Sequence, residues 1–288
     1  MSFIARWVLR PRVVSSDPDL AVWTSASRYL KNGWPRVHSG LKRLVSPLLS
    51  RDVSLRVPRR IGGRLVWTRP WLLREAAPEP HVIEWIRRTL PDKGTFFDIG
   101  AHYGWMAITA AHRAGPRGRV VAFEPSPVLL NVLSDHKRMN RLHQIEIVSS
   151  AVSNTDSGTV PLFLINGGLS SRNSLAIGPE DTPYIRPEDK LRIDVACTTV
   201  DSFVSASGVI PDVLKIDVEG AELLVLEGAK RLLEAHHPAL ILGVHPYWLP
   251  REHSVDQIFA FLNALGYRVE DQHVLPFDSS YLADYLCI

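Results

Sequence analysis

From residue 81 onward, short apolar runs alternate with longer segments in which apolar residues recur at helical spacing. The short runs predict strands, because a buried strand needs only a few consecutive apolar residues. They place strands at 95–100, 119–125, 144–153, 212–217, 239–246, 267–270 and 283–288. The helical spacing places helices at 81–90, 105–115, 127–140, 201–206, 220–236 and 254–266. This alternation is typical of βαβ units around a mostly parallel sheet that carries helices on both faces.

Two parts of the chain depart from the alternation. Residues 157–165 and 191–200 have the pattern of two strands of an inserted β-hairpin. Residues 1–75 hold scattered proline and arginine and are expected to be irregular. The sequence therefore predicts an α/β domain over 76–288, preceded by an N-terminal extension over 1–75. Asp201 is the candidate N-cap of the short helix that follows the hairpin.

The cysteine content and the apolar runs narrow the class of protein. Cys197 and Cys287 are the two cysteines of the chain and lie far apart, so neither a disulfide framework nor a zinc-ligand cluster is expected. A reducing, cytoplasmic compartment is the corresponding expectation. No run approaches the roughly 20 apolar residues of a membrane-spanning helix, and the first residues lack the pattern of a signal peptide.

The net charge of +3 conceals a strong asymmetry between the two ends of the chain. Residues 1–74 contain 15 lysines and arginines against three acidic residues, whereas the remainder is acidic. This split suggests an anionic partner for the N-terminal part, such as a membrane surface, a phosphorylated substrate or nucleic acid. Residues 3–10, FIARWVLR, have the pattern of a short amphipathic helix that would lie at a membrane surface. Alternatively, the arginines keep the extension soluble or dock it on the acidic domain.

Candidate chemistry is concentrated where strands end, which is where ligands bind in open sheets of this kind. The first such stretch is FFDIGAHYGW, residues 96–105. Gly100 and Gly104 would let the backbone approach a ligand, although tight-turn geometry alone also explains them. Asp98 is more informative, because a carboxylate beside the turn repels a pyrophosphate and suits a ligand that carries an amino group.

The second stretch is VVAFEPSP, residues 120–127, in which Glu124 lies 24 residues after Gly100. An acid at this place accepts hydrogen bonds from ribose hydroxyls in nucleotide-binding sheets, although it is also explained as a solvated acid at a strand end. With Asp98 and the two glycines, Glu124 fits S-adenosylmethionine better than NAD. The chain contains no phosphate-binding G-x-x-x-x-G-K-[ST] motif.

The third stretch is KIDVEGAELLVLEGA, residues 215–229, which passes from a buried strand into a helix. Lys215 and Asp217 share one face of the strand, since successive side chains alternate. Glu219 and Glu222 can be explained by the helix dipole, which favours acids in a first turn. That explanation does not cover Lys215 and Asp217, which a cofactor, a substrate or a metal ion is expected to hold.

His245 ends the next strand and is the candidate base for a hydroxyl acceptor, with a capping or core histidine as the alternative. Asp217 could orient His245, ligate Mg²⁺ or bind the acceptor hydroxyl. Carboxylates with waters suit Mg²⁺, but the sequence offers no complete cage, so no metal ligands are assigned. Tyr103, Trp105 and Trp248 are candidates for stacking on adenine or a sugar, and core packing is the alternative for Trp105.

These stretches resemble the FkbM-type S-adenosylmethionine-dependent methyltransferases over a region from about Glu75 to about Trp248. The resemblance is carried by FFDIGAHYGW, RVVAFEPSP, AVSN, GGLSSRNS, TTVD and, above all, DVLKIDVEGAELLVLEGA. It implies a Rossmann-like, class I methyltransferase domain with a mostly parallel seven-stranded sheet. It also implies O-methylation of a hydroxyl, often on sugars, glycolipids or polyketides, so a small-molecule, sugar or lipid-linked glycan acceptor is expected.

The resemblance also implies roles for particular residues. One position departs from the family, which often has an acid two residues before the histidine of the fifth strand, where this chain has Gly243. From the residues themselves, and not from the resemblance, the predicted catalytic residues are Lys215, Asp217, Glu219 and His245. The implied cofactor-binding residues are Asp98, Gly100, Ala101, His102, Tyr103, Gly104, Glu124, Pro125, Ser126 and Ala151.

Two alternatives remain open on the sequence alone. One is a nucleic-acid methyltransferase that grips its substrate with the basic N-terminal region. Against it, the fourth strand ends in Lys-Ile-Asp-Val rather than in an aromatic-rich amino-methylation motif. The other is a binding module that keeps the fold without catalysis, against which the intact cofactor motifs argue.

Overall fold

The computed structural model of the chain describes residues 56–74, 78–156, 158–165, 168, 169, 173–175, 190–277 and 280–288. The predicted amphipathic helix at 3–10 lies outside the described residues, as does most of the polar loop between the hairpin strands. The described chain divides into two units, one with 56–59 and 65–74 and the other with 60–64 and 78–288.

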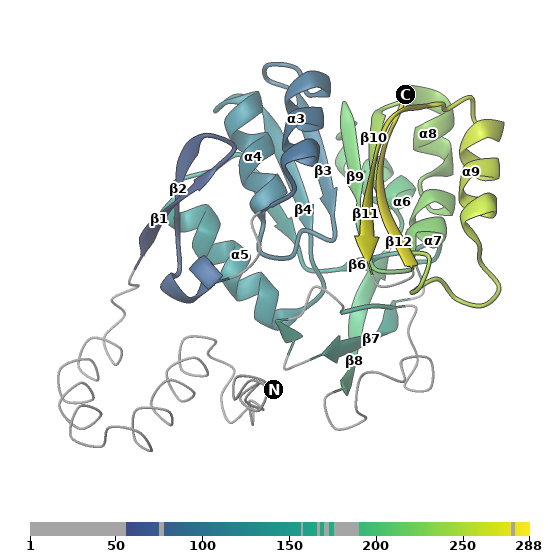
Figure 1. Cartoon of the computed structure of the whole chain (residues 1–288), viewed down its shortest axis with the longest axis horizontal. Coiled ribbons are helices and arrows are strands. Elements are labelled where there is room, and N and C mark those ends of the chain that lie inside the picture. The colour runs from purple at the N-terminus through teal and green to yellow at the C-terminus, as the bar shows by residue number, and fades with distance from the viewer. Residues whose placement is uncertain are drawn as a thin grey trace. The chain divides into compact units, whose positions relative to one another are not determined.

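A seven-stranded sheet forms the centre of the second unit (Figure 1). Its described strands are β3 (Thr95–Ile99), β4 (Arg119–Phe123), β5 (Ile145–Val148), β9 (Val213–Ile216), β10 (Ala239–Val244), β11 (Val269–Phe277) and β12 (Ser280–Cys287). Their order across the sheet is β11-β12-β10-β9-β3-β4-β5. β12 is antiparallel to both of its neighbours, and the pairs from β10 to β5 are parallel. The mostly parallel seven-stranded sheet predicted from the sequence is confirmed.

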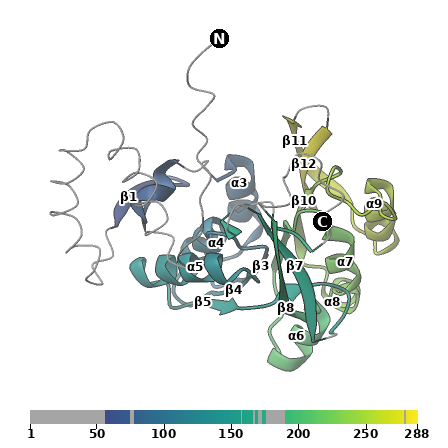
Figure 2. The same cartoon turned by 90° about the horizontal axis from the view of Figure 1, so that it is seen from below.

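Helices cover both faces of this sheet, as the view from below shows (Figure 2). One face carries α3 (Pro80–Thr89), α4 (Trp105–Ala114) and α5 (Pro127–Met139). The other carries α6 (Val200–Ser207), α7 (Glu222–Glu227), α8 (Lys230–His236) and α9 (Val255–Ala264). On this second face Phe97, Leu214 and Leu240 from adjacent strands join one buried apolar cluster with the helices. Because strand side chains alternate, Asp98 and Lys215 point to the face of α3 and α4.

The inserted hairpin is also present. β7 (Thr159–Ile165) pairs antiparallel with β8 (Lys190–Thr198), and the two-residue strand β6 (Ala151–Val152) joins β8 in parallel. The single strand predicted at 144–153 is therefore wrong, because it divides into β5 and β6, which belong to different sheets. The backbone turns between them, where the Ser150 N–H donates to the carbonyl of Val148 at 2.9 Å.

Three other predicted elements differ from the structure. The strand predicted at 267–270 is β11, which begins at Val269 and continues to Phe277. The helix predicted at 220–236 is interrupted between α7 and α8, where Gly228 lies against another strand end. A Cβ added to Gly228 would lie 2.1 Å from the carbonyl oxygen of Ser153, so only glycine fits there. The expectation of irregular chain up to residue 75 is also wrong, because β1 (Val57–Ile61) pairs with β2 (Arg64–Thr68), followed by the 3-10 helix η2 (Pro70–Arg74).

Asp201 caps a helix, but not the predicted one. Thr199 is the N-cap of α6, and its hydroxyl accepts the N–H of Ser202 at 3.0 Å. Asp201 lies in the first turn of α6 and accepts the N–H groups of Arg231 and Leu232 of α8, both at 2.9 Å. It thus satisfies the first free donors of a neighbouring helix.

None of the helices in the described residues is both long and apolar enough to span a lipid bilayer.

Replacing Asp201 with alanine should lower the free energy of unfolding by about 1–2 kcal/mol, because two helix-terminal N–H groups lose their acceptor. Urea denaturation would measure the change. Asp194→Ala is the matched control, since Asp194 and its ion-pair partner Arg192 are both exposed and such pairs contribute at most about 1 kcal/mol. Equal stability of the two variants would contradict the capping role.

Candidate active site

The candidate site lies where the strand order reverses, between β3 and β9. Here the two strand ends are tied together by the N–H of Asp217, which donates to the carbonyl of Ile99 at 3.1 Å. Gly100 makes this approach possible, because an added Cβ would lie 1.9 Å from the carbonyl oxygen of Asp217. Its φ of 80° is also one that glycine adopts most easily.

The turn between β3 and α4 brings backbone N–H groups to this edge of the sheet. His102 and Gly104 have φ values of 51° and 83°, so the turn is largely left-handed. A Cβ added to Gly104 would lie 2.3 Å from the side chain of Leu133. The N–H of Gly104 donates to the carbonyl of Ala101 at 2.7 Å, and α4 begins at the next residue. Free N–H groups at such a helix start favour polar or anionic ligand groups.

Glu124, directly after β4, is buried beside this turn. Its carboxylate accepts the N–H of His102 at 2.9 Å and the N–H of Ser126 at 2.8 Å. Burial raises the pKa of Glu124 to about 7, although these two hydrogen bonds act in the opposite direction. A carboxylate offers about four acceptor positions, so two remain for the hydroxyl groups of a ligand.

The other predicted cofactor-binding residues fall in two places. Tyr103 and Ser126 hold the loop after β7, since their hydroxyl groups donate to the carbonyls of Leu169 (2.8 Å) and Gly168 (3.3 Å). They therefore join the turn to the hairpin. Ala151 lies in β6 and packs in the small apolar core of the hairpin. Trp105 is buried and packs on His136, with ring centroids 4.6 Å apart, in agreement with core packing.

Lys215 is a buried cation between two carboxylates. Its Nζ lies 3.0 Å from Asp217 Oδ2 and 3.6 Å from Asp98 Oδ1, and its side chain is 7% exposed. Burial would lower the pKa of Lys215, but the charges of Asp217 and Asp98 outweigh it and raise this pKa. Asp98 is fully buried, and neither of its carboxylate oxygens has a hydrogen bond within the described residues. Burial accordingly raises the pKa of Asp98, with Lys215 acting against it.

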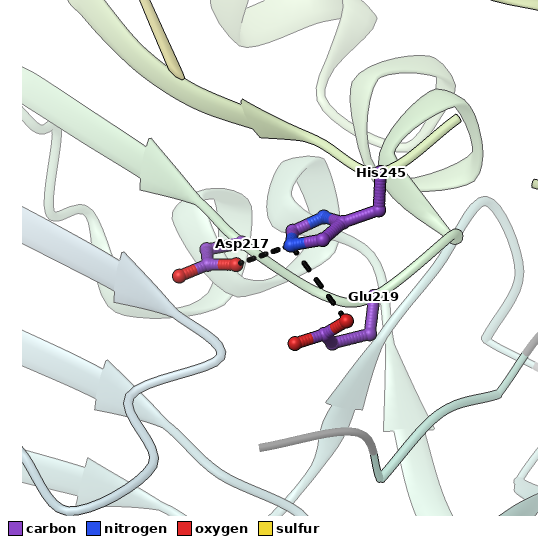
Figure 3. A group of neighbouring side chains, drawn as sticks. All are labelled: Asp217, Glu219 and His245. Carbon is purple, nitrogen blue, oxygen red and sulfur yellow. Dashed lines mark ion pairs between the residues drawn. The ribbon is translucent and has the colours of Figure 1, made fainter. Parts of the chain in front are cut away.

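His245 lies on the other side of Asp217, at the end of β10 (Figure 3). Its Nε2 is 3.6 Å from Asp217 Oδ1 and 3.7 Å from Glu219 Oε2. Its Nδ1 is 2.8 Å from Oε1 of Glu222, a side chain with no exposed surface. Burial would lower the pKa of His245, but the three acids outweigh it and raise this pKa to about 10. For Asp217, the nearby charges of Lys215 and His245 outweigh burial and lower the pKa.

The segment after β9 is held in an unusual backbone conformation. Glu219 is a non-glycine residue with a φ of 54°, and its carbonyl accepts the hydroxyl of Ser174 at 2.6 Å. The next residue, Gly220, has a φ of 103°, and an added Cβ would lie 2.1 Å from the carbonyl oxygen of Trp248. Left-handed non-glycine residues are strained and persist where the surroundings fix them, often at functional sites. The turn thereby directs the Glu219 carboxylate toward His245.

The role of Glu222 was not predicted from the sequence, in which the helix dipole explains an acid at this position. In the structure Glu222 is the hydrogen-bond partner of His245, and its Oε1 also accepts the N–H of Gly220 at 3.0 Å. The signal available in the sequence was its position three residues after Glu219, on a helix that starts at the site.

A second missed carboxylate occupies the space beside Gly243. A Cβ added to Gly243 would lie 3.2 Å from Asp284 Oδ1 and 3.3 Å from Asp217 Oδ1. Asp284 is the cross-strand partner of Gly243 on β12, and its other oxygen lies 2.6 Å from Nε2 of His81. The acid that the family often carries on the fifth strand is absent here, and the neighbouring strand brings a carboxylate to the same place.

The fold and the strand ends together define a class of protein. A mostly parallel seven-stranded sheet with one antiparallel strand, a glycine turn after β3 and an acid after β4 are the features of a Rossmann-like, class I methyltransferase fold. Within this class the chain belongs to the FkbM family, because residues 98–269 match the methyltransferase FkbM domain.

Individual relatives are distant. Methyltransferase sdnD of Sordaria araneosa is 28% identical over 48% of this chain and 61% of its own length. The crystal structure of methyltransferase FkbM from Methylobacillus flagellatus KT is 16% identical, with 72% of this chain and 51% of that chain covered and a TM-score of 0.43. Aeropyrum pernix fibrillarin, solved with natively bound S-adenosyl-L-methionine, is 15% identical, with 69% and 68% covered and a TM-score of 0.40. The chain thus spans about half to three-fifths of the length of the first two.

The raised pKa of Glu124 predicts that cofactor binding depends on pH. Glu124 is predicted to accept hydrogen bonds from ribose hydroxyls as the ionised carboxylate, and with a pKa of about 7 that form becomes scarce as the pH falls. The affinity for S-adenosylhomocysteine should therefore be about tenfold weaker at pH 6 than at pH 8, by calorimetric titration. Glu124→Gln should bind more weakly at both pH values and lose this dependence. An equal pH dependence in both proteins would contradict the assignment.

Proposed function

We propose that this protein transfers a methyl group from S-adenosylmethionine to a hydroxyl oxygen of a sugar, glycolipid or other secondary metabolite. One observation supports the proposal most directly: Asp217 lies between two sets of residues that suit different ligands. On the β3 and β4 side are the glycine turn and Glu124, and on the β10 side are His245 and Glu219. A cofactor and an acceptor placed on the two sides would meet at Asp217.

The residues on the first side fit S-adenosylmethionine. Glu124 retains acceptor positions for ribose hydroxyls, and the turn at 100–104 allows close approach of the backbone. Asp98 is a buried carboxylate without a hydrogen-bond partner in the described residues, which suits the positive amino group of the cofactor. When bound, the cofactor supplies a methyl group on a positively charged sulfur.

The second side is proposed to hold the acceptor. The Asp217 side chain is 39% exposed, against 9% for His245 and 14% for Glu219, so it is the carboxylate that an acceptor reaches most easily. We assign Asp217 to accept the hydrogen bond of the acceptor hydroxyl and to align its oxygen. Lys215 holds the other oxygen of Asp217 and so fixes its orientation. His245 and Glu219 position the remaining polar groups of the acceptor.

Other proposals rest on the sequence. The acceptor class follows from the resemblance to the FkbM family, and a requirement for Mg²⁺ remains a prediction. Contact of the basic residues 1–75 with an anionic membrane surface and a cytoplasmic location are likewise predictions. The nucleic-acid alternative also depends on that N-terminal region, and no contact in the described site favours it.

Asp217→Asn and His245→Asn should each abolish turnover while S-adenosylhomocysteine binding stays within about threefold of wild type. Turnover would be measured as S-adenosylhomocysteine release with a panel of glycan, glycolipid and polyketide hydroxyl acceptors. Glu227→Gln, an exposed acid of α7, is the control and should retain wild-type turnover. Wild-type rates in both site variants would refute the proposed acceptor side.

A further inference from the structure

The distances among Asp217, Glu219 and His245 fit ligands of one metal ion better than hydrogen-bonded partners. The two Nε2···O distances of 3.6 and 3.7 Å exceed the roughly 2.7–3.2 Å of N–H···O hydrogen bonds. Two ligand atoms bound tetrahedrally at about 2.1 Å from one ion lie about 3.4 Å apart. One ligand atom from each of the three residues lies within 4.8 Å of the others. Figure 3 shows the imidazole directed between the two carboxylates.

The imidazole is also oriented as a metal ligand requires. Glu222 holds Nδ1 at 2.8 Å, which keeps one proton on that nitrogen, so an ion that displaces the second proton of the ring would bind at Nε2. Metal-binding histidines usually donate the N–H of their other ring nitrogen to an acceptor, often a carboxylate. The His245 side chain is 9% exposed, and its Nε2 makes no hydrogen bond within the described residues. This buried nitrogen is directed at the same point as the two carboxylates.

The charge of the surroundings favours a cation. Among the described residues, carboxylates on or beside this group outnumber basic side chains. The acids are Asp98, Asp217, Glu219, Glu222 and Asp284, and the bases are Lys215, His245 and His81. An excess of buried negative charge is costly unless a cation compensates it.

From these observations we propose that Asp217 Oδ1, Glu219 Oε2 and His245 Nε2 bind one divalent ion of the Mn²⁺ or Zn²⁺ type. One nitrogen and two carboxylate oxygens form a mixed set that suits these ions. Mg²⁺ prefers an octahedron of oxygens and should bind more weakly.

The role of the ion rests on the proposed function. With the ion bound, the acceptor hydroxyl would reach Asp217, Glu219 and His245 through the ion rather than by direct hydrogen bonds, since its oxygen would complete the coordination. A metal-bound hydroxyl gives up its proton to water more readily than a free one. Lys215 holds Oδ2 of Asp217, which leaves Oδ1 for the ion. The ion and the cofactor would then lie on opposite sides of Asp217.

The test is calorimetric titration of MnCl₂, ZnCl₂ and MgCl₂ into the chelator-treated full chain, with Mn²⁺ binding repeated by electron paramagnetic resonance. Wild type should bind one Mn²⁺ or Zn²⁺ with a micromolar Kd, and Mg²⁺ at least tenfold more weakly. Asp217→Asn and His245→Gln should each weaken Mn²⁺ binding at least 100-fold. Glu222→Gln should weaken it about 10- to 100-fold, since it acts through the histidine.

Two controls separate the outcomes. Glu227→Gln, on the same helix as Glu222, should bind Mn²⁺ as wild type does. S-adenosylhomocysteine affinity, measured on every variant, shows whether each protein is folded and whether the cofactor side works. Cofactor binding without saturable Mn²⁺ or Zn²⁺ binding, or metal binding that His245→Gln leaves unchanged, would overturn the metal site alone. Metal binding without cofactor binding would instead count against the proposed function.

Discussion

The buried ammonium group of Lys215 is the interaction on which the arrangement of the site depends. It lies between Asp98 on β3 and Asp217 at the end of β9, on adjacent strands. An unpaired charge at this depth would be strongly unfavourable, so the three groups stabilise one another only while the two strand ends stay together. Gly100 permits that proximity, since a side chain there would collide with the backbone of Asp217. The proposed cofactor and acceptor sides are therefore fixed relative to each other.

The two faces of the sheet differ in composition at the strand ends: one is apolar and the other carries charged residues. On the face of α6–α9, Phe97, Ile99 and Leu214 pack into a continuous apolar core. On the opposite face, at the same strand ends, Asp98 and Lys215 take the alternate positions. Burial of apolar side chains on the first face stabilises the fold. This stability offsets the cost of burying charged side chains on the second face, where apolar side chains would be more favourable. A one-residue shift of either strand would exchange the two faces, which explains why the register must be exact.

Much of the fold could be predicted because its signals are local. Apolar runs, helical spacing and the glycine turn identified most of the strands and helices and the strand ends at which Asp98, Glu124 and Asp217 lie. The predictions failed where a distant segment decides the outcome. Gly228, where the predicted helix is interrupted, lies too close to Ser153 for any side chain, and Asp201 caps a helix about 30 residues away.

The same reason limits the prediction of the site. Asp284 faces Gly243 only because β12 pairs with β10, and a single sequence does not reveal that register. Glu222 was visible as an acid at a helix start, but its bond to His245 requires the strand order to be known. The polar residues at one strand end can thus be predicted from sequence. Their hydrogen-bond partners and neighbouring carboxylates come from other elements, and predicting them requires the strand pairing to be known.

The most direct test of the account is a crystal structure of the protein with S-adenosylhomocysteine. The account predicts the ribose hydroxyls within hydrogen-bond distance of Glu124, the amino group near Asp98, and the sulfur directed toward Asp217. S-adenosylhomocysteine bound elsewhere, or bound with its ribose away from Glu124, would contradict it.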